Sequence, residues 1–282
     1  MKKILSGVFL ALMLILAVLP AYAANIQIKV DDVAIASDVA PETMNNRTMV
    51  PLRVISENLG ATVDWSNSEV ILSKNDMQVL LKLNNAIAVK NGNTVLLDVK
   101  PYLKNNRVMV PLRFIAETFG YDVNYENFTV NVATEPLAIN GVKVQALQHE
   151  YHMTMGGVVQ QIKGNAYNKA IYDIFLANKG NRAKIPASYS WQVNIDTPGA
   201  YYKIGQYDFL DVNGNSIQRF DIYGLINSHP AETLAEFPEV LLYDTTENQW
   251  YLFSDTAIQS ISQLVDTATK NGFLTVISNT VV

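Results

Sequence analysis

A 21-residue segment occurs twice in the first half of this 282-residue chain, and the repeat restricts the possible folds more than any other feature. The segment NNRTMVPLRVISENLGATVDW (45–65) returns sixty positions later as NNRVMVPLRFIAETFGYDVNY (105–125), with twelve identical residues. Several substitutions keep the type of side chain, and Trp65, for example, is matched by Tyr125. The two copies are therefore expected to form the same local elements.

Each copy has the pattern of a strand, a short helix and a second strand. Pro51 and Pro111 stand where the helices would begin, which suits proline because the N–H it lacks has no intrahelical partner there. Gly60 and Gly120 follow as helix stops. The apolar residues between them fall on one helical stripe: Leu52, Ile55 and Leu59, and in the second copy Leu112, Ile115 and Phe119.

Alternating segments around these helices predict strands. They lie at Ile26–Val30, Val33–Ala36, Ala61–Trp65, Val70–Leu72, Met77–Leu83, Ile87–Lys90, Thr94–Val99, Tyr121–Tyr125 and Phe128–Val132. Together with the helices they predict a duplicated N-terminal module of the α+β class, in which short helices lie against a mainly antiparallel sheet.

Both copies also carry an Arg and a Glu four residues apart on the helix, Arg53/Glu57 and Arg113/Glu117. Such pairs are common on solvated helix faces, where each stabilises the helix by about 0.2–0.5 kcal/mol. The second interpretation is a paired recognition surface for a polymeric ligand. The sequence leaves both interpretations open.

The two N-N-R-x-M-V-P-L-R-x-I-x-E-x-x-G segments, with the V-x-W or V-x-Y strand after each, resemble the copper amine oxidase-like N-terminal domain, or stalk domain, of secreted bacterial proteins. The resemblance covers about residues 25–133 and places a stalk domain at 24–133. It implies a small α+β module that is attached to many different envelope proteins and has no catalytic residues of its own. It implies neither copper nor oxidation.

The tetrapeptide Asn124–Asn127 is similar to the core from which amine oxidases make their quinone cofactor. That motif needs a Thr three places before the Asn, where this chain has Tyr121, and the chain also lacks a His-x-His copper pair. Because Tyr125 aligns with Trp65 of the other copy, we interpret it as an aromatic packing position on a strand.

The first 23 residues have the pattern of a secretory signal. Lys2 and Lys3 precede the apolar run Ile4–Leu19, and Ala21-Tyr22-Ala23 supplies a cleavage site. We therefore expect a mature protein that begins at Ala24 and is secreted, extracellular or cell-wall associated, with no membrane span after cleavage. An uncleaved N-terminal anchor is the alternative.

Composition excludes several classes of protein. The net charge is −5, and it becomes −7 once the two leader lysines are removed, so nucleic acid is not an expected partner. The absence of cysteine excludes disulfides, thiol catalysis and thiolate metal sites.

Thr134–Pro136 has the composition of a short linker, and residues 137–282 form a second, β-rich α+β domain for which we recognise no family. Its last part predicts a hairpin, a helix capped by Ser254 or Asp255, and a strand at Phe273–Ile277. Tyr167–Ala177 fits a strand and a helix equally. The other expected strands are Val142–Leu147, Tyr189–Ile195, Tyr201–Leu210 and Ser216–Tyr223.

The second half offers little recognisable chemistry. His149 and His152 lack the spacing of a zinc protease helix and, on a strand, would project to opposite faces. Copper(I) capture by His149, His152, Met153 and Met155 is the alternative to ordinary surface residues. His229 lies in a loop without an evident partner. Asp211–Asn215 begins like a calcium loop but lacks the closing acid, where Ile222 stands, so it predicts a hairpin turn.

Aromatic residues gather on the expected strands of this half and could form either a half-buried core or a platform on which sugars stack. Packing is the more common use of such residues on strands. The residues concerned are Tyr189, Trp191, Tyr201, Tyr202 and Tyr207.

We assign no catalytic residue, cofactor-binding residue or metal ligand from the sequence. The preferred interpretation is a non-catalytic envelope or extracellular protein, in which the stalk module positions a C-terminal domain that binds a wall polymer or an envelope protein. The alternatives are an extracellular hydrolase of wall or exopolysaccharide with its active site in residues 137–282, and a metal-handling protein.

Overall fold

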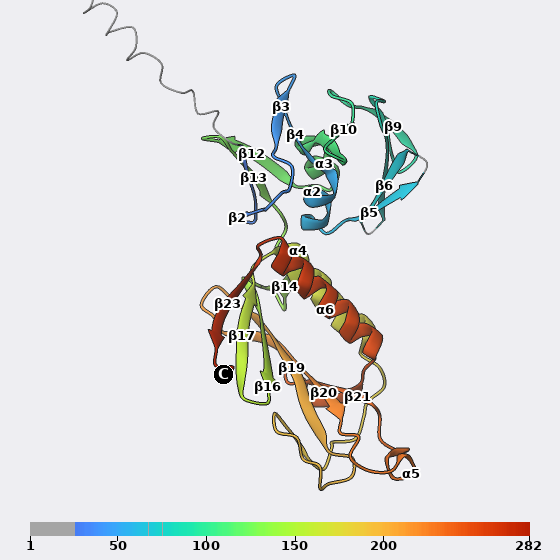
Figure 1. Cartoon of the computed structure of the whole chain (residues 1–282), viewed down its shortest axis with the longest axis vertical. Coiled ribbons are helices and arrows are strands. Elements are labelled where there is room, and N and C mark those ends of the chain that lie inside the picture. Colours follow the sequence, from blue (N-terminus) through green and yellow to red (C-terminus); the bar gives the residue numbers. More distant parts are fainter. Residues whose placement is uncertain (1–25, 67, 75) are drawn as a thin grey trace, which may run out of the picture.

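The computed structural model describes residues 26–66, 68–74 and 76–282. The predicted signal peptide lies outside these residues. We use "the module" for residues 26–133 and "the second part" for residues 137–282 (Figure 1).

The two repeats meet in a central four-stranded sheet of the module. Its order is β10 (Tyr102–Lys104), β11 (Arg107–Pro111), β4 (Arg47–Pro51) and β3 (Glu42–Met44). The middle strands β4 and β11 are the same segment of the two copies, and they pair antiparallel with Val50 opposite Val110. The copies are thus related by a local two-fold arrangement about this pair.

A seven-residue helix follows each middle strand, as the sequence predicts. These helices are α2 (Leu52–Asn58) and α3 (Leu112–Thr118). Pro51 and Pro111 are the cap residues, and Gly60 and Gly120 take the left-handed φ values of +78° and +82° that end a helix without strain. Each helix packs against both middle strands.

Two outer sheets complete the module. An antiparallel five-stranded sheet contains β5 (Thr62–Ser66), β6 (Glu69–Lys74), β7 (Met77–Lys82), β8 (Ile87–Lys90) and β9 (Asn93–Leu96). A four-stranded sheet has the order β12 (Asp122–Glu126), β13 (Thr129–Ala133), β1 (Gln27–Val30) and β2 (Val33–Ala34). Three sheets therefore replace the single sheet that the sequence suggested.

The strand β1 departs from the expected antiparallel pairing, because it runs parallel to β13. A parallel pair needs a long connection between its strands, and here that connection is nearly the whole module. Strand β1 precedes the first copy and β13 ends the second. The pairing therefore closes the module by joining its first strand to its last.

The second part consists of one large sheet with two long helices on one face, in agreement with the predicted α+β class (Figure 1). The sheet has the order β22 (Gln249–Leu252), β21 (Val240–Asp244), β20 (Ser216–Leu225), β19 (Tyr201–Leu210), β16 (Ala146–Met153), β17 (Gly156–Ile162) and β23 (Leu274–Asn279), and β18 (Tyr189–Ser190) pairs with β19. The remaining elements are α4 (Asn165–Asn178), α6 (Asp255–Lys270), the short α5 (Ala231–Leu234) and the small hairpin of β14 (Ala138–Ile139) and β15 (Val142–Lys143).

The structure decides the ambiguous segment in favour of a helix, because Tyr167, Ile171 and Phe175 are buried at a spacing of four residues in α4. Ser254 caps α6 as predicted, and its Oγ accepts a hydrogen bond of 3.2 Å from the Ala257 N–H. The strand expected at Tyr189–Ile195 is wrong beyond Ser190. The Ser190 hydroxyl both accepts from the Gln192 N–H and donates to the Gln192 carbonyl, which turns the chain out of the sheet.

The first residue of the predicted linker, Thr134, is held by hydrogen bonds to the module. Thr134 is buried, and its N–H and hydroxyl donate to the Asp31 carboxylate at 2.8 and 2.9 Å. The same carboxylate accepts from the N–H of Asn165, the first residue of α4, at 3.1 Å. One acidic side chain in the β1–β2 turn therefore holds the linker and the first long helix.

A second set of contacts joins the module to the long helices. The Tyr167 hydroxyl of α4 donates to Asn58 Oδ1 of α2 at 2.8 Å and accepts from Asn271 Nδ2 at 2.9 Å. The main buried apolar cluster also runs through both parts and includes Ile28 and Phe273. The second part therefore has a defined orientation on the module.

Candidate functional site

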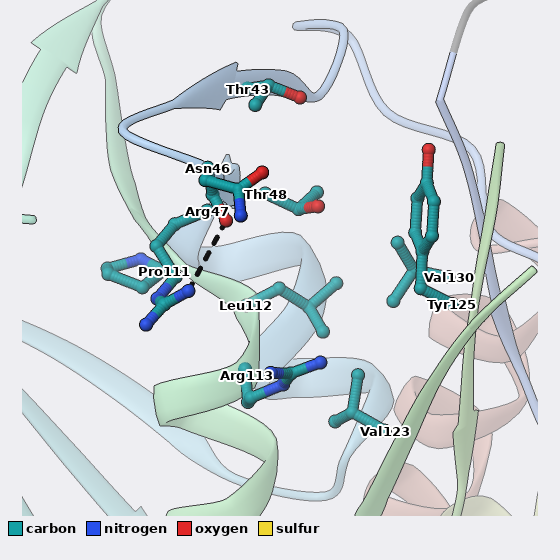
Figure 2. A pocket seen from close by; sticks show the side chains of 10 residues that line it. All are labelled: Thr43, Asn46, Arg47, Thr48, Pro111, Leu112, Arg113, Val123, Tyr125 and Val130. Carbon is teal, nitrogen blue, oxygen red and sulfur yellow. Dashed lines mark hydrogen bonds between the residues drawn. The ribbon is translucent and has the colours of Figure 1, made fainter. Parts of the chain in front are cut away.

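A cleft on the module is bordered by both copies of the repeat. Figure 2 shows this cleft, here called cleft A, which is lined among others by Asn46, Arg47, Arg113, Val123 and Tyr125. Its volume is about 290 Å³. Asn46 and Arg47 come from the β3–β4 hairpin of the first copy, whereas Arg113 comes from α3 and Tyr125 from β12 of the second.

A second cleft uses the same positions with the copies exchanged. Cleft B is lined among others by Asn106, Arg107, Arg53, Val63 and Trp65, and its volume is about 790 Å³. These residues lie sixty positions from their equivalents in cleft A. Each cleft therefore takes its hairpin from one copy and its helix and outer strand from the other.

The strand pairing in the central sheet explains why each cleft combines residues of both copies. Because β4 and β11 pair antiparallel at Val50 and Val110, the hairpin that leads into one middle strand lies beside the helix that follows the other. A single copy of the repeat would supply only part of each cleft. The intact pair supplies two complete ones.

The two-asparagine turns of the repeat form the hairpins at the cleft edges. Asn45 and Asn46 have φ values of +48° and +60°, and Asn105 and Asn106 have the same two values. Two successive left-handed residues are the pattern of the tight hairpin turn, and asparagine tolerates this conformation better than most residues. The next residue, Arg47 or Arg107, is thereby placed at the cleft.

An aromatic ring stands on the outer strand of each cleft. Tyr125 is 50% exposed and Trp65 is 49% exposed. Tyr125 was interpreted as a packing position, but only about half of its surface is buried. In Figure 2 its ring faces the hairpin residues Thr43 and Thr48 across the cleft. The outer strands thus present flat apolar surfaces at equivalent places.

Charges in the clefts are balanced by nearby carboxylates. Arg47 Nε lies 2.6 Å from Asp98 Oδ2, and the equivalent Arg107 Nη2 lies 2.5 Å from Asp38 Oδ2. The helix pairs that the sequence identified are also present, at 3.5 Å for Arg53 with Glu57 and 3.8 Å for Arg113 with Glu117. All four pairs are at least partly exposed, so each contributes only about 0–1 kcal/mol to stability. They orient side chains more than they stabilise the fold.

The two histidines of the second part point to opposite faces of the sheet, as predicted. His149 is largely buried on the helix side, where its ring stacks on Tyr207 with centroids 4.3 Å apart. Burial lowers the pKa of His149 to about 4, so it is neutral at pH 7. His152 stacks on Trp191 at 4.0 Å and lies 2.8 Å from Glu150 Oε1. The structure does not bring the two imidazoles together.

The other candidates for ion binding have ordinary structural partners. Asp211 Oδ1 accepts from the N–H groups of Asn213 and Asn215, both at 2.8 Å, so the segment forms the predicted hairpin turn. His229 Nδ1 lies 2.9 Å from Ser228 Oγ. Among the described residues, no three His, Cys, Asp or Glu side chains are grouped so that they could hold a metal ion.

Aromatic residues of the second part mostly serve as core, which was the more common of the two interpretations. Tyr201 and Tyr207 are 2% and 4% exposed. Tyr189 and Tyr202 retain more exposure, at 45% and 38%, but Tyr189 packs edge-on against Trp250. No continuous row of exposed rings results among these described residues.

Two carboxylates of the large sheet could be compared with the acid pair of a hydrolase, but both have structural partners. Asp221 is buried and ion-paired with Lys203 and Arg219, each at 2.8 Å. Burial raises the pKa of Asp208, and its carboxylate accepts a hydrogen bond from Ser216. The partners of both carboxylates thus come from the sheet itself.

The exchange of hairpins between the copies was not predicted from the sequence. The sequence does indicate some of the cleft residues, because the arginines and aromatic residues stand at equivalent positions of the two copies: Arg53, Arg113, Trp65 and Tyr125. The meeting of a hairpin from one copy with the helix of the other leaves no such signal, because it depends on how the two middle strands pair.

Comparison with known proteins supports the resemblance of the first half. Residues 29–134 match the sequence model of the copper amine oxidase N-terminal domain. No curated protein and no solved structure matches the chain. In the described part of the chain no helix is long and apolar enough to cross a membrane. Residues 29–134, with their two repeats and paired clefts, belong to the copper amine oxidase N-terminal domain family.

Proposed function

We propose that this chain is a secreted, non-catalytic protein of the bacterial cell envelope or extracellular space that binds a wall polymer or an envelope protein. The module acts as a stalk that holds the second part in a fixed orientation. The observation that carries the proposal is the junction, in which the carboxylate of Asp31 binds Thr134 and Asn165.

A fixed junction suits a positioning role because a flexible linker would leave the second part free to rotate. Here the linker is buried at Thr134, and Tyr167 bridges Asn58 of the module and Asn271 at the end of α6. The leader pattern in residues 1–23 supports secretion, and the match to a non-catalytic module supports a binding role.

The two alternative functions receive less support. A hydrolase would need carboxylates that are free to reach substrate, but Asp208 and Asp221 have Ser216, Lys203 and Arg219 as partners. A metal-handling protein would need His149 and His152 to share a ligand, and their contacts place them on opposite faces.

Co-sedimentation tests the binding role. The full-length mature protein is mixed with purified bacterial cell walls that have been stripped of protein, and the pelleted fraction is measured against wall concentration. We expect saturable sedimentation. A protein that stays in the supernatant at all wall concentrations would contradict wall binding.

The positioning role needs a second measurement. Small-angle scattering of the mature protein should fit one rigid body, and the double variant Asp31→Asn/Tyr167→Phe should give a broader distribution of shapes with the helix and strand content unchanged. A wild type that already samples many orientations would count against the stalk.

A further inference from the structure

We propose that cleft A and cleft B are two related binding sites for sugar units of an uncharged polysaccharide. This inference rests on the proposed function and deepens it, because it names the class of ligand and places its binding in the module. It also joins the two interpretations of the repeated helix pairs, since Arg53 and Arg113 are solvated and at the same time line a cleft.

The aromatic rings are the first part of the argument. A pyranose ring has an apolar face of C–H groups, which fits against a flat aromatic ring, and a rim of hydroxyls that need hydrogen bonds. Tyr125 and Trp65 are about half exposed at equivalent positions, so each cleft has such a flat surface. Aromatic side chains that are half apolar and half wet are frequent at binding interfaces.

Polar groups opposite the rings suit the hydroxyl rim. In cleft A, Asn46 and Thr48 lie across the cavity from Tyr125 and bring both donors and acceptors (Figure 2). In cleft B, Asn106 occupies the position of Asn46, whereas Leu103 and Val108 stand where cleft A has Thr43 and Thr48, so this wall of cleft B is more apolar. An apolar wall with a few well-placed polar groups is the usual composition of a small-ligand site.

The charge balance favours an uncharged ligand over a polyanion. The arginines nearest the hairpin turns, Arg47 and Arg107, are already paired with Asp98 and Asp38 at 2.6 and 2.5 Å. A phosphate or carboxylate would have to compete with these carboxylates, and the mature chain is itself acidic. Paired guanidinium and carboxylate groups can still exchange hydrogen bonds with sugar hydroxyls.

The presence of two sites fits a ligand with repeating units. When one chain of a polymer occupies both sites, the second binding event becomes intramolecular, and the apparent affinity rises without new contacts. Cleft B is the larger, and Lys270 and Asn271 from the end of α6 extend it. We therefore expect cleft B to take the longer stretch of sugar and to bind more tightly than cleft A.

Isothermal titration calorimetry tests the proposal with three uncharged probes. They are the hexamer of N-acetylglucosamine and the six-glucose fragments of cellulose and of starch, and heparin is the polyanionic comparison. At least one uncharged hexamer should bind the full-length mature protein. Trp65→Ala and Tyr125→Ala should each weaken the measured affinity, and the double variant should weaken it by about tenfold or more, as expected for aromatic anchors.

Matched variants separate binding from folding. The swaps Trp65→Tyr and Tyr125→Trp keep an aromatic ring and should retain the affinity within about threefold, because the flat surface of each cleft is preserved. Phe128→Ser is the control, because Phe128 is 57% exposed in the turn between β12 and β13, lines neither cleft and corresponds to Ser68 of the first copy. Circular dichroism and thermal unfolding check that each variant is folded.

Binding of none of the uncharged hexamers, tighter binding of heparin, or unchanged affinity in the folded double variant would each overturn the proposal. Its failure can be distinguished from failure of the wall-binding role. If wild type and the double variant sediment equally with cell walls, the protein binds walls through another surface.

Discussion

The two repeats of the module form the same elements, but they differ at the positions that meet the second part of the chain. Asp31 of the first copy holds Thr134 and Asn165, whereas its equivalent Asn91 accepts from the Gln78 N–H inside its own sheet at 2.7 Å. Asn58 binds Tyr167 of α4, and its equivalent in the second copy is Thr118.

This comparison separates two kinds of information in the repeat. Residues that are identical in the copies, such as the asparagine turn, the proline and the glycine, specify local elements and the way the copies pair. Residues that differ specify the attachment of the second part. Truncations and substitutions at these positions test this division.

The largest effect should come from separating the copies. Residues 25–75 expressed alone should remain unfolded, because α2 loses its contact with β11 and Val50 loses its partner Val110. Residues 25–133 should fold as one unit. Amide dispersion in two-dimensional NMR spectra distinguishes the outcomes, and a single repeat that unfolds cooperatively would contradict the exchange of elements between copies.

The second prediction concerns the acidic residue that is found in the first copy alone. Asp31→Asn gives the turn the side chain that Asn91 provides in the second copy, but it removes the charge that three donors of Thr134 and Asn165 now share. The free energy of unfolding should fall by about 1.5–3 kcal/mol, the usual range for hydrogen bonds to a charged group.

Asp32→Asn is the control for this variant, because it alters an exposed acid one position away in the same turn. Urea unfolding of both variants gives the comparison. Equal stability of the two would show that the Asp31 contacts contribute nothing to the junction.

The third prediction compares the two helix-ending glycines. A Cβ at Gly120 meets no atom within 4 Å, so Gly120→Ala should cost only the left-handed backbone term of about 1–2 kcal/mol. A Cβ at Gly60 would lie 3.3 Å from the Cβ of Ala166 in α4 and 3.5 Å from Lys74 Nζ. Gly60→Ala should therefore destabilise the protein more than Gly120→Ala in thermal unfolding, and the reverse order would argue against a close contact between module and α4.

The last prediction is a pH dependence that only the first copy has. Burial lowers the pKa of Lys74 from 10.5 to about 8, and the charge of Lys169 in α4 contributes to this lowering. Between pH 8 and 10.5 the unfolded chain binds more protons at this residue than the folded chain. Stability should consequently rise with pH across this window, and below pH 8 the difference stays constant.

Lys74→Met tests this dependence, because the variant lacks the titrating group. The difference in unfolding free energy between wild type and Lys74→Met should shift in favour of wild type from pH 8 to 10.5. Lys82→Met, on the neighbouring strand, serves as the control. Parallel pH profiles for wild type and Lys74→Met would refute the prediction.

Much of the local structure could be predicted from the sequence because it depends on near neighbours. The glycine stops at Gly60 and Gly120, the Ser254 cap and the strand Tyr201–Leu210 all follow from short-range rules and all are confirmed. The family of residues 29–134 was identified from the repeated motif.

Long-range arrangement could not be predicted in the same way. The parallel pairing of β1 with β13, the burial of Thr134 and the exchange of hairpins between copies all depend on contacts between distant segments. The half-exposed state of Trp65 and Tyr125 depends on the same exchange, because the strand pattern alone predicts packing for both. The strand expected beyond Ser190 was wrong since a side-chain hydrogen bond ends it.

The parallel pairing of β1 with β13 has a mechanical consequence. The two strands are in register over four residue pairs, from Gln27 with Thr129 to Val30 with Val132. A tension applied between the amino end of β1 and the second part of the chain would pull these strands past each other, so the load would be shared by the whole ladder. An antiparallel hairpin pulled at its open end would instead separate one hydrogen bond at a time. The module would therefore resist stretching along this direction more strongly than its small size suggests.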